Sequence, residues 1–172
     1  LIKQATRQGQ HNTDIIREAV VNKNLSVLGT SSSCIFTLRE EYPHLLNIDN
    51  GDVHDNIELA TRFLFRLVDS GKLKLVFKKD YHKRIAYHTP CHMARLGWSI
   101  YSTSLLRMIP GVEFTMLDSQ CCGIAGTYGF KKENYATSQS IGASLFKQIS
   151  EVNQDVVATD CETCKWQIEM ST

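Results

Sequence analysis

A cysteine follows a short, mainly apolar run in the stretch Arg84-Ile85-Ala86-Tyr87-His88-Thr89-Pro90-Cys91-His92. Residues 84–88 predict a strand, residues 89–92 a turn, and residues 93–109 a helix that ends at Pro110-Gly111. The predicted order is therefore strand, cysteine-bearing turn and helix.

Two later strand patterns lead into loops and helices in the same order. We expect a strand over 112–117, a loop over 118–129, a helix over 132–150, a strand over 155–158, a turn over 159–161 and a helix from Glu162. Strands that alternate with helices in this way are typical of a parallel sheet. The predicted fold class is α/β, with a parallel sheet flanked by helices.

The N-terminal half predicts a shorter series of elements. We expect a helix over 14–22 with Asp14 as its N-cap, a strand over 25–29, a helix over 35–42 that ends near Pro43, a helix over 55–69 and a basic linker over 72–83. This half also carries an echo of the C-terminal end. The stretch 15–34 repeats the element order of 145–164, which lies 130 residues later.

In that echo, Val27 falls on Val157 and Cys34 on Cys164, whereas Ser31 stands where the later copy has Cys161. We infer two related modules, of which the first is incomplete. Residues 1–83 are then the back half of the first module plus the linker, and residues 84–172 are the complete second module. Both ends of the chain look cut, so we expect a piece of a longer polypeptide.

Five of the six cysteines lie in the second module. They are Cys91, Cys121, Cys122, Cys161 and Cys164. Ligands of open parallel sheets bind outside the carboxyl ends of the strands, so we expect the three cysteine groups to converge at one edge. Adjacent helix N-termini carry partial positive charge that suits thiolates. Vicinal cysteines also suit two ligands of a multi-metal cluster better than a disulfide, so the pattern favours one iron–sulfur cluster.

Three other interpretations remain open on the residues alone. Cys161 and Cys164 have the spacing of a thioredoxin-like redox pair, although that chemistry does not need the other three cysteines. A structural zinc site needs four ligands, often from two Cys-x-x-Cys pairs, and this chain has one such pair. The cysteines are unrelated buried residues in the third interpretation.

The segment 88–92, the triplet Cys121-Cys122-Gly123 and the pair Cys161/Cys164 together resemble the CCG cysteine-rich domain family. Iron–sulfur subunits of heterodisulfide reductase, glycolate oxidase and lactate utilisation belong to that family. Residues 117–129 and 159–170 are most similar to its anaerobic glycerol-3-phosphate dehydrogenase group. The resemblance implies a [4Fe–4S] cluster, non-cubane in form, bound by the five cysteines of the second module, and it leaves Cys34 without its expected partners.

The resemblance also implies a function. It implies a non-catalytic subunit that passes electrons from flavin-containing catalytic subunits, which oxidise sn-glycerol 3-phosphate, to membrane quinone. It further implies a peripheral protein that helps to anchor those subunits at the cytoplasmic face of the bacterial inner membrane. The alternative within the family is an iron–sulfur subunit like that of heterodisulfide reductase, lactate utilisation or glycolate oxidase, whose cluster either relays electrons or itself splits a disulfide. The alternative outside the family is a zinc-stabilised interaction module.

The remaining features limit other functions. The net charge is +1 and basic residues are spread along the chain, so we expect no nucleic-acid partner. No apolar run approaches the ~20 residues of a membrane-spanning helix. His88 and His92 flank Cys91, and we expect them to form hydrogen bonds around the metal ligands rather than to replace one.

Overall fold

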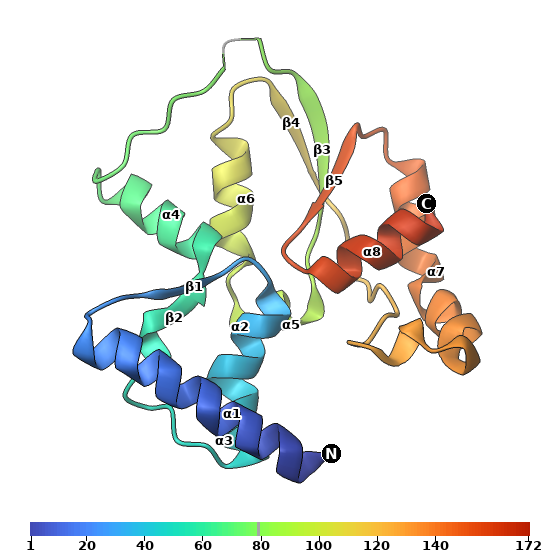
Figure 1. The fold of residues 1–172 in the computed structure, drawn as a ribbon. Coiled ribbons are helices and arrows are strands. Elements are labelled where there is room, and N and C mark those ends of the chain that lie inside the picture. Colours follow the sequence, from blue (N-terminus) through green and yellow to red (C-terminus); the bar gives the residue numbers. More distant parts are fainter. Residues whose placement is uncertain (79) are drawn as a thin grey trace.

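Two parallel sheets, one of two strands and one of three, form the framework in the computed structural model, which describes residues 1–78 and 80–172 (Figure 1). Helices flank both sheets, which confirms the predicted α/β class. None of the described helices is both long and apolar enough to cross a membrane. The relation between two modules stays a prediction.

The three-stranded sheet has the order β4-β3-β5, and both pairings are parallel. Its strands are β3 (Lys83–His88), β4 (Val112–Met116) and β5 (Val156–Thr159). Ile85 to His88 of the central strand are all buried, as expected for a strand covered on both faces. Because the strands are parallel, their carboxyl ends lie at one edge of the sheet.

A helical segment follows each of these strands. These segments are α5 (Cys91–Leu96) and α6 (Ser99–Arg107) after β3; the 3₁₀ turns η4 (Tyr128–Phe130) and η5 (Lys132–Asn134) and α7 (Tyr135–Glu151) after β4; and α8 (Glu162–Ser171) after β5. Helices α7 and α8 lie on one side of the sheet and α6 on the other (Figure 1). The predicted strands and helices of residues 112–171 are confirmed to within a few residues.

The N-terminal half holds the smaller sheet. Its elements are α1 (Ile2–Arg17), the π-helical η1 (Glu18–Asn22), β1 (Val27–Gly29), α2 (Ser32–Phe36), the π-helical η2 (Thr37–Glu41), α3 (Tyr42–Leu46), the 3₁₀ turn η3 (His54–Asn56), β2 (Ile57–Leu59) and α4 (Ala60–Asp69). Strand β1 pairs in parallel with β2. In its described part, the predicted linker over 72–83 has no helix, and β3 begins at its last residue; residue 79 lies outside the described residues.

The predicted helix over 55–69 is wrong in its first part. Ile57, Glu58 and Leu59 form β2 and are all buried, and α4 begins only at Ala60. The apolar spacing from Ile57 into the helix fits a helical face, but pairing with β1 decides the conformation of these three residues.

Three further helix boundaries differ from the prediction. The helix expected over 93–109 is broken at Gly97, which ends α5 in the left-handed conformation with φ +69°. The helix expected to end near Pro43 continues past it, because α2, η2 and α3 follow one another without a gap from Ser32 to Leu46, where Asn47 ends the run in the left-handed conformation. The helix expected over 14–22 begins at Ile2.

A buried carboxylate, Asp160, joins the two halves of the chain. It follows β5 and accepts hydrogen bonds from the Tyr87 hydroxyl of β3 and, at 3.0 Å, from the Ser102 hydroxyl of α6. Its backbone carbonyl accepts the N–H of Ser32, the first residue of α2, at 2.7 Å. Burial raises the pKa of Asp160, so its hydrogen bonds are what stabilise it in the interior.

We expect Tyr87→Phe to lower the free energy of unfolding by about 1–3 kcal/mol, because it removes a donor from a buried carboxyl group. Urea denaturation measures this change. The matched control is Tyr128→Phe, at an exposed tyrosine, which we expect to change stability by less than about 0.5 kcal/mol. Equal effects of the two substitutions would contradict the structural role of Asp160.

Candidate metal centre

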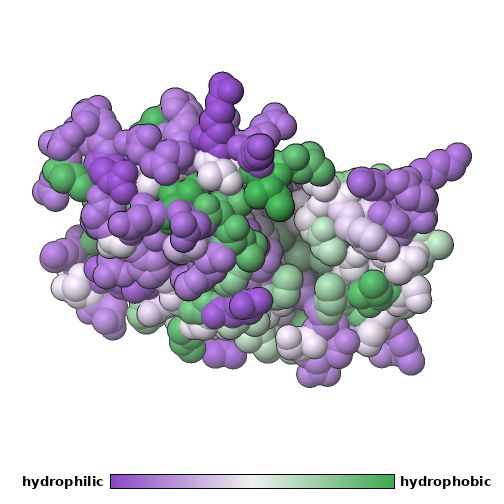
Figure 2. Space-filling model, turned by 90° about the horizontal axis from the view of Figure 1, so that it is seen from below, coloured by the Kyte–Doolittle hydropathy of each residue, from purple (hydrophilic) through white to green (hydrophobic). Residues whose placement is uncertain are grey.

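All five predicted cysteines line one cavity of about 540 Å³ at the carboxyl edge of the three-stranded sheet. Cys91 begins α5 after β3, Cys121 and Cys122 lie in the loop after β4, and Cys161 and Cys164 stand at the start of α8 after β5. Figure 2 views the molecule from this side and shows a hollow near its middle. The structure brings the five residues together, and their role as ligands stays a prediction.

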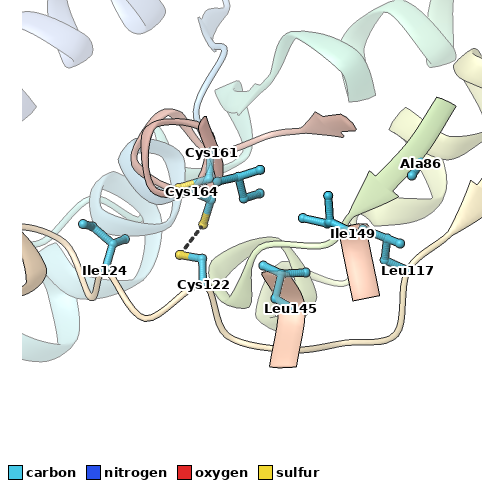
Figure 3. Close-up of a cluster of buried hydrophobic side chains, with 9 residues drawn as sticks. Ala86, Leu117, Cys122, Ile124, Leu145, Ile149, Cys161 and Cys164 are labelled. Atoms are coloured by element: carbon cyan, nitrogen blue, oxygen red, sulfur yellow. Dashed lines mark hydrogen bonds between the residues drawn. The ribbon is translucent and has the colours of Figure 1, made fainter. Parts of the chain in front are cut away.

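Three of the five cysteines are part of the hydrophobic core. Cys122, Cys161 and Cys164 are at most 5% exposed. They pack with Ala86, Leu117, Ile124, Leu145, Ile149 and Ile168 (Figure 3). Cys91 and Cys121 are exposed to solvent. The cavity therefore has a buried sulfur wall and an open side, while the exposed Cys34 is not among its lining residues.

The buried thiols share hydrogen bonds. The Sγ atoms of Cys122 and Cys164 lie 3.2 Å apart and point toward each other in Figure 3. Hydrogen bonding with Cys164 lowers the pKa of Cys122 and, with help from Ser33 and Thr163, lowers the pKa of Cys161 to about 4. The pKa of Cys164 is raised by the same two cysteine contacts and by burial. These shifts favour the thiol form at Cys164 and the thiolate form at Cys122 and Cys161.

Gly123 lets the cysteine loop approach α7 closely. Its φ is +86°, and a Cβ at this position would lie 2.0 Å from the backbone oxygen of Ser138. The Ser138 hydroxyl donates to the Gly123 carbonyl at 2.9 Å, and the Gly123 N–H donates to Cys121 Sγ at 3.3 Å. A glycine after Cys121-Cys122 therefore fixes both the loop and one sulfur.

Residues of the N-terminal half complete the cavity wall. The sequence did not predict this contribution. Ser33, Thr37 and Glu41 of α2 and η2 line the cavity. The Ser33 hydroxyl lies 3.4 Å from Cys161 Sγ, whose other hydroxyl neighbour is Thr163 at 3.3 Å. Ser33 and Thr163 are themselves 130 residues apart, which is the offset of the internal repeat, but the repeat does not by itself show that the two hydroxyls lie beside Cys161.

The two histidines beside Cys91 have different surroundings. His92 shares a 3.0 Å hydrogen bond with the Ser33 hydroxyl and stacks on Phe36, with ring centroids 4.7 Å apart. His88 is buried, and burial lowers its pKa to about 4, so its ring is neutral at pH 7. Neither ring nitrogen of His88 has a hydrogen-bond partner in the described part of the chain.

The donor set fits a group with several metal atoms. Within residues 1–78 and 80–172, no three His, Cys, Asp or Glu side chains are grouped closely enough to hold one metal ion. A zinc site takes four ligands on a single ion, whereas the thiolates that hold an iron–sulfur cluster bind different irons. Five thiols around a cavity of this size match the second arrangement.

Residues 85–169, which include all five cysteines of the cavity, match the family model described as a cysteine-rich domain, CCG. This segment is a CCG domain. The predicted family is thereby confirmed, and the match begins after the N-terminal half that completes the cavity wall.

The region of similarity to individual relatives covers nearly the whole chain. The chain is 60% identical over 168 residues to one subunit of the anaerobic glycerol-3-phosphate dehydrogenase of Escherichia coli K12, which covers 98% of this chain and 42% of the relative. It is 29% identical over 167 residues to one subunit of the dihydromethanophenazine:CoB–CoM heterodisulfide reductase of Methanosarcina barkeri, covering 94% and 38%. It is 30% identical over 168 residues to an uncharacterized iron–sulfur protein of Methanocaldococcus jannaschii, covering 96% and 32%. The chain thus spans less than half the length of these relatives.

We expect Gly123→Ala to lower the free energy of unfolding by about 2–5 kcal/mol, because it combines a strained φ with a clash against backbone. The control is Gly126→Ala, at φ +65°, where the added Cβ meets no described atom within 4 Å. We expect the control to cost about 1 kcal/mol. Urea denaturation of the two variants compares them, and similar losses would argue against close packing of the CCG loop on α7.

Proposed function

We propose that the CCG domain binds one iron–sulfur cluster and that the chain is the electron-transfer part of an anaerobic glycerol-3-phosphate dehydrogenase. The observation that carries the proposal is the cavity, which draws five cysteines from the ends of three parallel strands. The 60% identity to a subunit of such a dehydrogenase supports the choice of complex.

The residues around the cavity have different roles in this proposal. The ligands are Cys91, Cys121, Cys122, Cys161 and Cys164, and the group is a [4Fe–4S] cluster of non-cubane form. Such a cluster supplies one-electron chemistry, while the protein supplies binding and sets the potential. The hydroxyls of Ser33 and Thr163 adjust the electron density of the Cys161 sulfur, and the buried side behind Cys122 and Cys164 excludes water.

The open side of the cavity gives electrons a route to partners. Cys91 and Cys121 are exposed there, so a redox partner that docks on this face comes close to the ligands. In our proposal the donors are flavin-containing catalytic subunits and the acceptor is membrane quinone. The chain then lies as a peripheral subunit at the cytoplasmic face of the inner membrane and helps to anchor the catalytic subunits.

The similarity to part of a heterodisulfide reductase favours a second candidate, in which a disulfide substrate reacts at the same open side. Reduction of a small disulfide by the loaded chain, with a supplied electron donor, separates the two candidates. The relay function requires that no disulfide be reduced under those conditions.

The ligand set is tested by loading the chain anaerobically with iron and sulfide. We expect Cys121→Ser to lose most of the bound iron and sulfide and to change the electron paramagnetic resonance spectrum, because one thiolate is missing from the cavity. Cys34→Ser is the matched control, since Cys34 is also an exposed cysteine but is not among the cavity's lining residues. An unchanged spectrum for Cys121→Ser would show that the ligand set is wrong, and zinc without sulfide in the wild type would refute the cluster.

A further inference from the structure

His88 is a buried polar side chain without a hydrogen bond. It is 1% exposed, and neither Nδ1 nor Nε2 has a partner among residues 1–78 and 80–172. Leaving a buried donor or acceptor unpaired costs about 1–3 kcal/mol. A buried side chain in this state can gain its hydrogen bond from a group bound beside it.

The position of His88 restricts where that partner can be. His88 is the last residue of β3 and stands opposite Thr159 in the register with β5, so its backbone is fixed by the sheet. Its side chain lines the same cavity as the five cysteines. His92, by contrast, already bonds to Ser33 and stacks on Phe36. Of the two histidines beside Cys91, His88 is therefore the cavity-lining one without a hydrogen-bond partner in the described part of the chain.

We propose that the imidazole N–H of His88 donates a hydrogen bond to a sulfur atom of the cluster, an inference that rests on the proposed function. A hydrogen bond to sulfur stabilises the more negative, reduced form and so raises the reduction potential. His88 is then a residue that contacts the cofactor and tunes it, and it is not an iron ligand.

The inference predicts opposite effects of His88→Leu on the metal-free and the loaded full chain. In the metal-free chain the substitution removes an unpaired polar ring, so the urea midpoint stays the same or rises. In the loaded chain it removes a donor from the cluster, so the midpoint potential falls. We expect at least a tenfold change in the ratio of reduced to oxidised cluster at a fixed potential, which is about 59 mV for a one-electron couple.

Two control variants make the test specific. His88→Gln keeps an N–H donor, and we expect its potential to lie between those of His88→Leu and the wild type. His11→Leu changes an exposed histidine of α1 and leaves both readouts unchanged. If His88→Leu fails to load a cluster while His88→Gln loads one, the need for a donor is supported.

The outcomes that overturn the inference are distinct from failure of the proposed function. Loaded His88→Leu with the wild-type potential overturns the inference alone, and so does failure of both His88 variants to load, since His88 is then a ligand. A fall in stability of the metal-free His88→Leu chain also contradicts it. A wild-type chain that takes up no iron and sulfide overturns the proposed function and the inference together.

Discussion

Parallel pairing of β3 with both β4 and β5 is the constraint on which the rest of the structure depends. It places three strand ends at one edge, so cysteines as far apart in sequence as Cys91 and Cys164 line a single cavity. If β4 or β5 ran the other way, its cysteine loop would lie at the opposite edge. Ile85 to His88 of the central strand are buried because helices cover both of its faces.

The cavity nevertheless depends on more than the CCG domain. Asp160 connects β5 to β3 and α6 through its carboxylate and to α2 through its backbone carbonyl. That connection sets Ser33 beside Cys161 and His92. The N-terminal half therefore forms one wall of the cavity, and the environment of the cysteine sulfurs comes from both halves. In our proposal this arrangement helps to set the potential of the bound cluster, because the hydroxyls of Ser33 and Thr163 lie beside the Cys161 sulfur.

The cysteine site could be predicted from the sequence because each cysteine group lies within a few residues of a recognisable strand end. Such local order requires only turn chemistry and the general geometry of parallel sheets. Strand β2 was missed because its three residues continue the apolar spacing of α4, and only pairing with distant β1 makes them extended. Ser33, Asp160 and the unpaired state of His88 were inaccessible for the same reason, since each is defined by contacts across the fold. The relation between residues 1–83 and 84–172 as two modules stays a prediction.

The central claim is that five cysteines at one sheet edge surround a single iron–sulfur cluster. Its most direct test is a crystal structure of the anaerobically loaded full chain, with diffraction data collected on both sides of the iron absorption edge. Our account predicts one compact group of iron atoms in the cavity, bonded to sulfurs of Cys91, Cys121, Cys122, Cys161 and Cys164. A single metal ion, or iron located away from these five sulfurs, would contradict it.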